Sequence, residues 1–170
     1  MNTIPEQSAG EAALWALLQR LGIHTESVSH PPVHTVEEAL PHWSKLAAQQ
    51  TKNLFLKDAK GALWLIVLPC ERRADLKAFA ARLGTRKFSF ASAELLASVL
   101  GVRQGSVTPL ALINDCERKV RLALDAALLQ APRIAFHPLV NTATTALATA
   151  DFLRFLEALG RSYETIEAAE

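Results

Sequence analysis

The sequence has few cysteines, little net charge and no long apolar run. Cys70 and Cys116 belong to no CxxC or Cys/His spacing, so we expect two ordinary buried thiols rather than a metal site. No segment approaches the roughly 18 apolar residues of a membrane helix, and no charged n-region with an apolar run opens the chain. The formal net charge is +1. Nucleic-acid binding would therefore require a local cluster of basic residues.

The length and composition are those of one stable domain. The chain has 170 residues, of which 50% are hydrophobic and 21% charged. A domain of this size buries roughly 70% of its unfolded surface, so its core requires no disulfide or metal. The proportion of charged residues argues against global disorder. No repeat, linker or low-complexity tract interrupts residues 1–170. We expect a single domain in a soluble, cytoplasmic protein.

Helix and strand signals follow one another irregularly along the chain. A capping box at Ser8–Glu11 opens the first helix, which ends at Gly22. A second capping box at Thr35–Glu38 opens a helix expected to end before Pro41. Further helices are expected over 74–83, 92–100 and 150–159, and strands over 23–29, 53–56, 63–68, 107–113, 119–124, 133–136, 142–148 and 163–166. Hairpins mixed with helices indicate an α+β fold with a central mixed, mainly antiparallel sheet flanked by helices.

Motifs of the well-known catalytic classes are missing. The sequence contains no GxSxG, HExxH or P-loop, and no GxGxxG that follows a strand. Four of the five histidines lie before the expected hairpin: His24, His30, His34 and His42. Two prolines between the second and third of them prevent helical i,i+4 pairing, and metal ligands are usually held on rigid elements. We expect solvated loop histidines and no metal or other cofactor.

Three short segments are candidates for a functional site. His137 follows an apolar strand and precedes a proline bend, a position equally typical of a packing histidine. The segment Gly101–Pro109 contains two glycines and a proline, so its backbone can approach a ligand and its free amides can stabilise an oxyanion. It also fits a plain connector. Lys52-Asn53 opens an apolar strand and, taken alone, is equally a solvated strand start.

Basic residues cluster in one stretch of the chain. Arg73 and Lys77 are four residues apart and would share a helix face, and Arg82 and Arg86 would bracket the end of that helix. The cluster also includes Arg72 and Lys87. It could follow an RNA backbone by neutralising phosphates, or it could be a solvated surface. As a tRNA-binding surface it would use Arg73, Lys77, Arg82 and Lys87.

Together these segments resemble the YbaK-like aminoacyl-tRNA deacylase family, homologous to the editing domain inserted in bacterial prolyl-tRNA synthetases. Lys52–Asp58 resembles its signature strand, and Gly101–Asp115 its glycine-proline loop. Phe136–Leu139, followed by Asn141 and Thr144, resembles its last motif. The order agrees over about residues 8–167, and the motifs are most like those of free-standing alanyl-tRNA(Pro) deacylases. The chain departs from the pattern at 43–50, which lacks a small glycine-containing turn.

The resemblance implies a mixed sheet with surrounding helices, ester hydrolysis and no required metal. It places catalysis at Lys52, Gly105, Ser106 and His137, and substrate binding at Asn53, Thr108, Pro109, Leu110, Leu112 and Phe136. Apolar wall candidates are Leu110, Leu112, Ile66 and Phe136, which would serve equally well as core. Expected partners are the acceptor end of tRNA(Pro) and, transiently, prolyl-tRNA synthetase, whereas neither a membrane nor DNA is expected.

The expected reaction is hydrolysis of alanyl-tRNA(Pro), with selectivity by pocket size. Such an ester is already activated, so it requires a positioned water and a stabilised oxyanion rather than a nucleophilic serine or cysteine. A synthetase pocket shaped for proline rejects a smaller side chain weakly, because a methylene is worth only ~1–3 kcal/mol. Cysteinyl-tRNA(Pro) is the alternative substrate. A non-catalytic nucleic-acid-binding protein and a small-molecule-binding module are the alternative functions.

Overall fold

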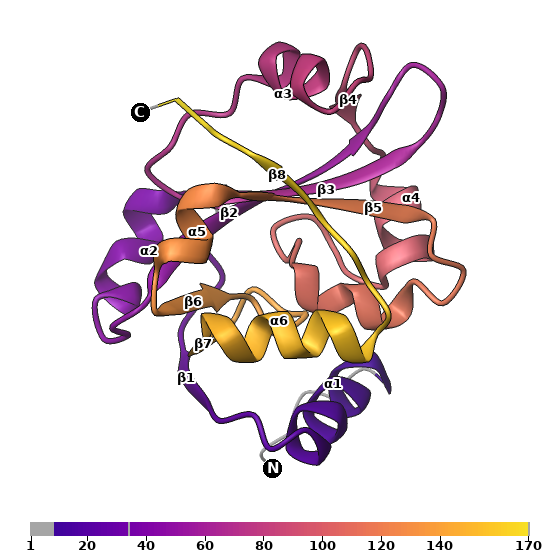
Figure 1. Ribbon diagram of the computed structural model, residues 1–170. Coiled ribbons are helices and arrows are strands. Elements are labelled where there is room, and N and C mark those ends of the chain that lie inside the picture. The colour runs from indigo at the N-terminus through magenta and orange to yellow at the C-terminus, as the bar shows by residue number, and fades with distance from the viewer. Residues whose placement is uncertain (1–8, 34, 170) are drawn as a thin grey trace.

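The computed structural model describes residues 9–33 and 35–169 and contains one eight-stranded sheet with helices on both faces (Figure 1). The sheet order is β1-β7-β6-β2-β3-β5-β8, and β4 also pairs with β2. Neighbours β1–β7, β6–β7, β2–β3 and β2–β4 are antiparallel, and β2–β6, β3–β5 and β5–β8 are parallel. The expected mixed sheet is confirmed. The strands are β1 (Thr25–Ser29), β2 (Gln49–Lys57), β3 (Leu63–Pro69), β4 (Ser89–Phe90), β5 (Val120–Asp125), β6 (Arg133–Phe136), β7 (Ala143–Ala148) and β8 (Glu164–Ile166).

The helices begin and end largely where capping residues predict. Thr35 accepts a hydrogen bond from the Glu38 amide (3.2 Å), and Gly101 ends its helix in the left-handed region at φ +66°. Ser8 lies outside the described residues. No helix in the described part is long and apolar enough to cross a membrane. The helices are α1 (Ala9–Arg20), α2 (Val36–Trp43), α3 (Leu76–Arg82), α4 (Ala93–Leu95), the π-helical η1 (Leu96–Leu100), the 3-10 helix η2 (Pro109–Asn114), α5 (Ala126–Gln130) and α6 (Thr149–Ala158).

Both faces of the central hairpin are buried. Along β3, Leu65 and Val67 join the main core with α1 and α6, while Ile66 and Leu68 pack on the opposite face near α3. Figure 1 shows α3 on one side of the sheet and α1 and α6 on the other. Because side chains of a strand alternate between faces, an apolar run without polar interruptions fits a strand covered on both sides.

The strand expected over 107–113 is wrong, because this segment forms the 3-10 helix η2. Thr108 caps it by accepting a hydrogen bond from the Leu110 amide (3.2 Å). Pro109 occupies the first turn, where its fixed φ suits a helix and its missing N–H costs nothing. Leu110 and Leu112 are both buried. A short apolar run buried on all sides has no periodicity that separates a helix from a strand.

Three other expectations also need correction. The helix α2 continues through Pro41 to Trp43 instead of ending before the proline. Its continuation is favoured by burial of Trp43 against Val33 and Ala39. The elements α5 and β4 were not expected from the sequence. Cys116 is exposed in a turn and Cys70 is half-buried, so the expectation of two buried thiols is wrong. Burial raises the pKa of Cys70 to about 11, with a further contribution from Glu71.

Asp58, the last residue of the signature strand, organises the hairpin turn and the adjoining loop. Its carboxylate is buried and accepts hydrogen bonds from the Lys60 and Ala62 amides, both at 2.9 Å. The Trp64 indole (3.1 Å) and the Thr85 hydroxyl (2.7 Å) donate to its other oxygen. Burial alone would raise the pKa of Asp58, but these hydrogen bonds outweigh it and hold the pKa below its usual value.

We expect Asp58→Ala to destabilise the fold by about 3 kcal/mol, because it leaves several buried donors without an acceptor. Asp75→Ala is a suitable control, since Asp75 caps α3 with a single hydrogen bond to the Ala78 amide at an exposed position and should cost only about 1 kcal/mol. The depressed pKa means that Asp58 stabilises the fold above its unfolded-state pKa, and that this contribution is lost as pH falls through the folded-state pKa. Urea unfolding of both variants at neutral pH measures the difference. Equal losses would contradict the role of Asp58.

Candidate active site

A cavity of about 540 Å³ opens where four segments of the chain meet. It lies between α2, the start of β2, the loop that precedes η2 and the residue that follows β6. Of the residues singled out from the sequence, it brings together Lys52, Asn53, Gly105 and His137. The remaining lining residues are Val33, Thr35, Ala39, Trp43, Thr51, Gln104 and Val107.

Two adjacent polar residues of β2 give the cavity a cation and an unpaired acceptor. Lys52 has no carboxylate within 4.0 Å in the described part of the chain, so its ammonium is available to an anion. The Asn53 amide donates to the Thr51 hydroxyl (3.3 Å), which donates to the Ala135 carbonyl (2.9 Å). The carbonyl oxygen of the Asn53 side chain is buried and has no partner within the described residues. A ligand donor that reached this oxygen would remove the cost of leaving it unsatisfied.

The loop before η2 contributes backbone to the cavity. Gly105 has φ +89°, and a Cβ there would lie 3.3 Å from Nδ2 of Asn141. The Ser106 amide donates to the Arg103 carbonyl (3.0 Å), and Ser106 is buried outside the cavity lining. The amides of Gly105 and Val107 have no acceptor among the described residues. The amide of Ser106 is therefore held in the turn, whereas those of Gly105 and Val107 keep an unused donor in residues that line the cavity.

His137 presents a neutral imidazole to the cavity. Its Nδ1 lies 3.1 Å from the Ala143 carbonyl, which can only accept, so Nδ1 carries the proton and Nε2 keeps its lone pair. Burial lowers the pKa of His137, and the neighbouring His30 lowers it further, against the opposing effect of the Ala143 hydrogen bond. At neutral pH His137 is thus a hydrogen-bond acceptor rather than a cation.

The apolar wall expected from η2 is not part of the cavity. Leu110 and Leu112 are packed in the main core, and Thr108 and Pro109 are buried outside the cavity lining. Ile66 lies in the core on the α3 side. Phe136 packs on Phe152, with ring centroids 4.8 Å apart, and borders only a small recess of about 10 Å³ behind the cavity. The apolar lining is instead Val33, Ala39, Trp43 and Val107.

The expectation of solvated loop histidines is wrong for His30. Its ring is buried and forms a hydrogen bond with the Thr144 hydroxyl. The centroid of the His30 ring lies 5.2 Å from that of His42 and 6.4 Å from that of His137. His24 is exposed, and His34 lies outside the described residues. Over 9–33 and 35–169, no group of three or more His, Cys, Asp or Glu side chains is placed to hold a metal. From this part of the chain the cavity is lined by Val33, Thr35, Ala39 and Trp43, which the sequence did not indicate.

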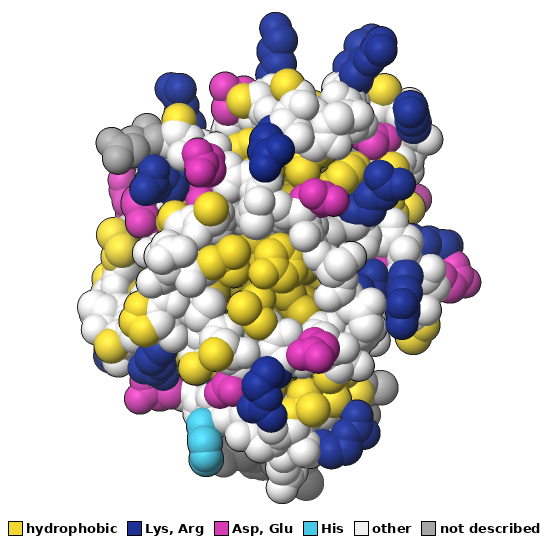
Figure 2. Space-filling view, viewed as in Figure 1, with side chains coloured by type: hydrophobic (Ala, Val, Ile, Leu, Met, Phe, Trp, Pro, Cys, Tyr) yellow, Lys and Arg dark blue, Asp and Glu magenta, His cyan; other side chains and the backbone are white. Residues whose placement is uncertain are grey.

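The basic residues lie on one exposed end of the molecule. Figure 2 shows Lys and Arg side chains gathered over α3 and β4. Arg73, Lys77, Arg82 and Lys87 are all exposed, and none forms an ion pair within the described residues. Arg73 precedes the cap of α3 and pairs with Ala169, so it does not share a helix face with Lys77 as expected.

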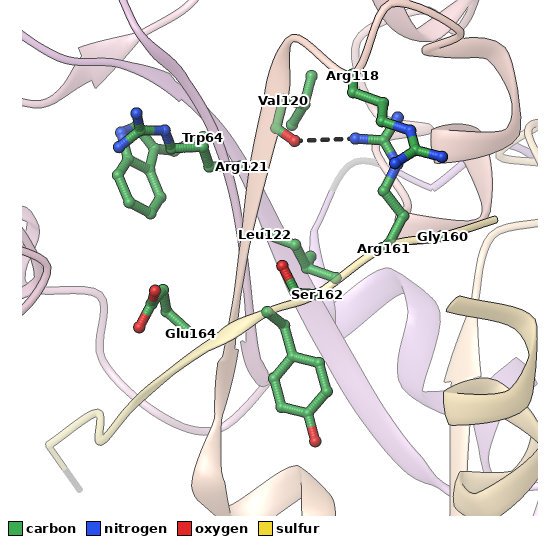
Figure 3. A pocket seen from close by; sticks show the side chains of 10 residues that line it. Trp64, Arg118, Val120, Arg121, Leu122, Gly160, Arg161, Ser162 and Glu164 are labelled. Atoms are coloured by element: carbon green, nitrogen blue, oxygen red, sulfur yellow. Dashed lines mark hydrogen bonds between the residues drawn. The ribbon is translucent and has the colours of Figure 1, made fainter. Parts of the chain in front are cut away.

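A second cavity, of about 370 Å³, lies at the opposite end of the β3–β5 pair, where β8 separates from β5 (Figure 3). Arg161 donates to the Val120 carbonyl (3.2 Å) and to the carboxylate of Asp115 (3.0 Å). Arg121 lies over the Trp64 ring, 5.4 Å from its centroid. The hydrogen bonds of Arg161 attach the segment after α6 to the start of β5 and the turn before it. The cavity joins none of the site residues expected from the sequence, so the first cavity is the candidate active site.

Comparison with known proteins identifies the family and relatives to which this chain is similar. A family model described as an aminoacyl-tRNA editing domain matches residues 30–155, which include every residue that lines the cavity. "Prolyl-tRNA synthetase associated domain-containing protein 1" of Danio rerio is 46% identical over 142 residues, covering 82% of this chain and 77% of that protein. "Prolyl-tRNA editing protein ProX" of Acetoanaerobium sticklandii is 34% identical over 156 residues, covering 91% of this chain and 95% of that protein. A crystal structure described as that of a candidate trans-editing enzyme for prolyl tRNA synthetase shares the fold, with a TM-score of 0.71, 20% identity, and coverage of 96% and 98%.

Proposed function

The chain belongs to the aminoacyl-tRNA editing domain family, and we propose that it is a free-standing hydrolase that deacylates mischarged tRNA(Pro). The proposed substrate is alanyl-tRNA(Pro). The observation that carries the proposal is the convergence of Lys52, Asn53, Gly105 and His137 on one cavity. These residues come from three distant segments of the chain, and together they supply a cation, acceptors and free backbone amides.

The proposed mechanism uses positioning and electrostatics rather than a protein nucleophile. Water attacks the ester carbonyl, and the oxyanion that forms accepts hydrogen bonds from the Gly105 and Val107 amides. The carbon–oxygen bond to the ribose then breaks, releasing the amino acid and the tRNA. Lys52 holds the terminal phosphate or ribose region, while the neighbouring ribose hydroxyl helps to orient the water. His137 accepts a hydrogen bond from the substrate ammonium group through Nε2.

The cavity is large enough for the end of an aminoacylated tRNA. At about 540 Å³ and open to solvent, it has room for an amino acid together with the terminal adenosine. Val33, Ala39 and Trp43 bound it on the α2 side. We propose that these side chains admit alanine and exclude proline. Cysteine is close enough in size to be the alternative substrate.

One experiment distinguishes the proposed hydrolase activity from the alternative of RNA binding without catalysis. Purified protein in excess is mixed with alanyl-tRNA(Pro) labelled in the alanine, and release of free alanine is followed against the spontaneous rate. A chelator in the buffer excludes catalysis by contaminating metal. Release well above the spontaneous rate is expected. Tight binding of the tRNA without accelerated release would favour the RNA-binding alternative. Binding to prolyl-tRNA synthetase, the other proposed partner, can be measured with the same preparation.

The pH dependence of the rate tests the role of His137. Because its pKa is depressed, the neutral form is present above that pKa and is lost as pH falls through it, at a value below 6.5. We expect kcat/KM to fall about tenfold per pH unit below this point, since the cationic ring would repel the substrate ammonium group. His137→Gln keeps an acceptor that does not titrate and should lose this acidic limb. An identical profile for wild type and variant would contradict the assignment.

The salt dependence of tRNA affinity tests the basic surface over α3 and β4. We expect neutralisation of Arg73, Lys77, Arg82 and Lys87 to reduce the slope of log affinity against log salt by up to about 3. These residues lie outside the cavity, so single-turnover hydrolysis at saturating tRNA should change little. Arg20→Gln and Arg118→Gln, also exposed but outside both the basic surface and the cavity lining, are controls for net charge. A slope that stays at the wild-type value would identify a solvated surface.

A further inference from the structure

Thr144, in β7, joins two elements of the cavity wall behind the candidate active site. It is buried, and its Oγ1 lies 3.2 Å from the Trp43 indole nitrogen in α2 and 2.8 Å from Nε2 of His30, which follows β1. These three residues come from separate segments, and only Trp43 lines the cavity. The hydroxyl of Thr144 therefore connects Trp43, in the cavity wall, to strand β7 of the sheet.

The hydrogen bonds around Thr144 run in one direction. The indole nitrogen can only donate, so Trp43 donates to the Thr144 hydroxyl oxygen. Nδ1 of His30 lies 2.9 Å from the Pro31 carbonyl and donates to it, and in this tautomer Nε2 accepts the Thr144 hydroxyl proton. Every polar side-chain group of Trp43, Thr144 and His30 has a hydrogen-bond partner, and these bonds fix the rotamers of the three side chains.

The helix α2 depends on such an anchor. It has only eight residues, and Pro41 inside it lacks an amide hydrogen. Its apolar residues join a small cluster of Val33, Ala39 and Trp43 rather than the main core. Figure 1 shows α2 at the side of the sheet, beside the beginning of β2. Besides this cluster, on which Cys70 also packs, α2 is held by the Trp43 indole and by the contact between the His42 and His30 rings.

Adjacent residues of β7 hold opposite parts of the cavity lining. The Ala143 carbonyl accepts the hydrogen bond that orients His137, and the Thr144 hydroxyl accepts the one that orients Trp43. The positions of His137 and Trp43 relative to each other are thus set by one strand. We propose that Thr144 is a positioning residue that determines which amino acids the cavity accepts, by fixing Trp43 at a set distance from His137. The inference rests on the proposed deacylase function and gives this motif residue a role in it.

The test is Thr144→Val, which keeps the shape of the side chain but removes the hydroxyl. It leaves the buried Trp43 and His30 nitrogens unpaired, so the indole should become mobile. We expect the ratio of alanyl-tRNA(Pro) to prolyl-tRNA(Pro) hydrolysis to fall about tenfold. Thr144→Ser should restore it, because serine keeps the hydroxyl. Hydrogen exchange of the Trp43 indole, followed by nitrogen-15 NMR, should quicken in the valine variant alone.

Thr145→Val is the matched control. Thr145 is the next residue of β7, is equally buried, and pairs with the Ser27 hydroxyl instead of the cavity wall. It should lose comparable stability without a change in the ratio or in Trp43 exchange. An active wild type with an unchanged ratio in Thr144→Val, or a serine variant that fails to restore it, would overturn the positioning role. A wild type that hydrolyses none of the esters would overturn the proposed function, and this inference with it.

Discussion

Alanyl-tRNA(Pro) should be hydrolysed at least ~10-fold faster than prolyl-tRNA(Pro), since one or two methylenes that do not fit cost ~1–3 kcal/mol or more. The backbone amides of Gly105 and Val107 cannot distinguish the two esters, because both present the same carbonyl. Discrimination must therefore come from the side chains around the amino acid. We propose that these are Val33, Ala39 and Trp43, which line the cavity on the α2 side, and not the leucines of η2, which do not line it.

The measurement is a panel of tRNA(Pro) charged with alanine, serine, cysteine or proline. Trp43→Ala should enlarge the space and raise prolyl-tRNA(Pro) hydrolysis relative to alanyl, whereas Leu112→Ala, within the core, should lower stability without changing the ratio. Equal wild-type rates for alanine and proline would remove steric exclusion as the mechanism. Much faster cleavage of the cysteinyl ester would still identify an aminoacyl-tRNA deacylase, but with cysteinyl-tRNA(Pro) as its substrate.

Most of the sheet could be predicted because its strands have local signals. The turn Lys57–Gly61 separates two apolar runs of strand length, and these runs form the β2–β3 hairpin. The segment 107–113 could not be assigned correctly, because Leu110 and Leu112 are buried on all sides and show no periodicity. Continuation of α2 past Pro41 likewise depends on tertiary packing of Trp43, which no local pattern encodes.

The site was predictable only where its residues lie in ordered motifs. Lys52, Asn53, Gly105 and His137 meet at the cavity, as the resemblance implied. Trp43 and Thr35 were not expected at the candidate site, because Thr35 was identified only as a helix cap and the chain departs from the family pattern over 43–50. Burial of His30 depends on Thr144, 114 residues away in the sequence, a contact that spacing along the chain cannot reveal.

Lys52→Ala should lower deacylation by at least ~10-fold while the fold is retained, a loss of roughly 1.4 kcal/mol or more of transition-state stabilisation. The Lys52 side chain lines the cavity and has no acidic partner in the described part of the chain, so its charge is not required by the folded structure. Its removal takes away the one cation that the cavity lining offers among the described residues. The loss should therefore appear in the reaction and not in the unfolding midpoint.

Lys57 provides the control, because it lies at the far end of the same strand, is exposed and does not line the cavity. The account is tested most directly by single-turnover hydrolysis of alanyl-tRNA(Pro) with wild type, Lys52→Ala and Lys57→Ala in parallel. Wild type and Lys57→Ala should release alanine at the same rate, and Lys52→Ala at least ~10-fold more slowly with an unchanged urea midpoint. A folded Lys52→Ala variant that releases alanine at the wild-type rate would contradict the account.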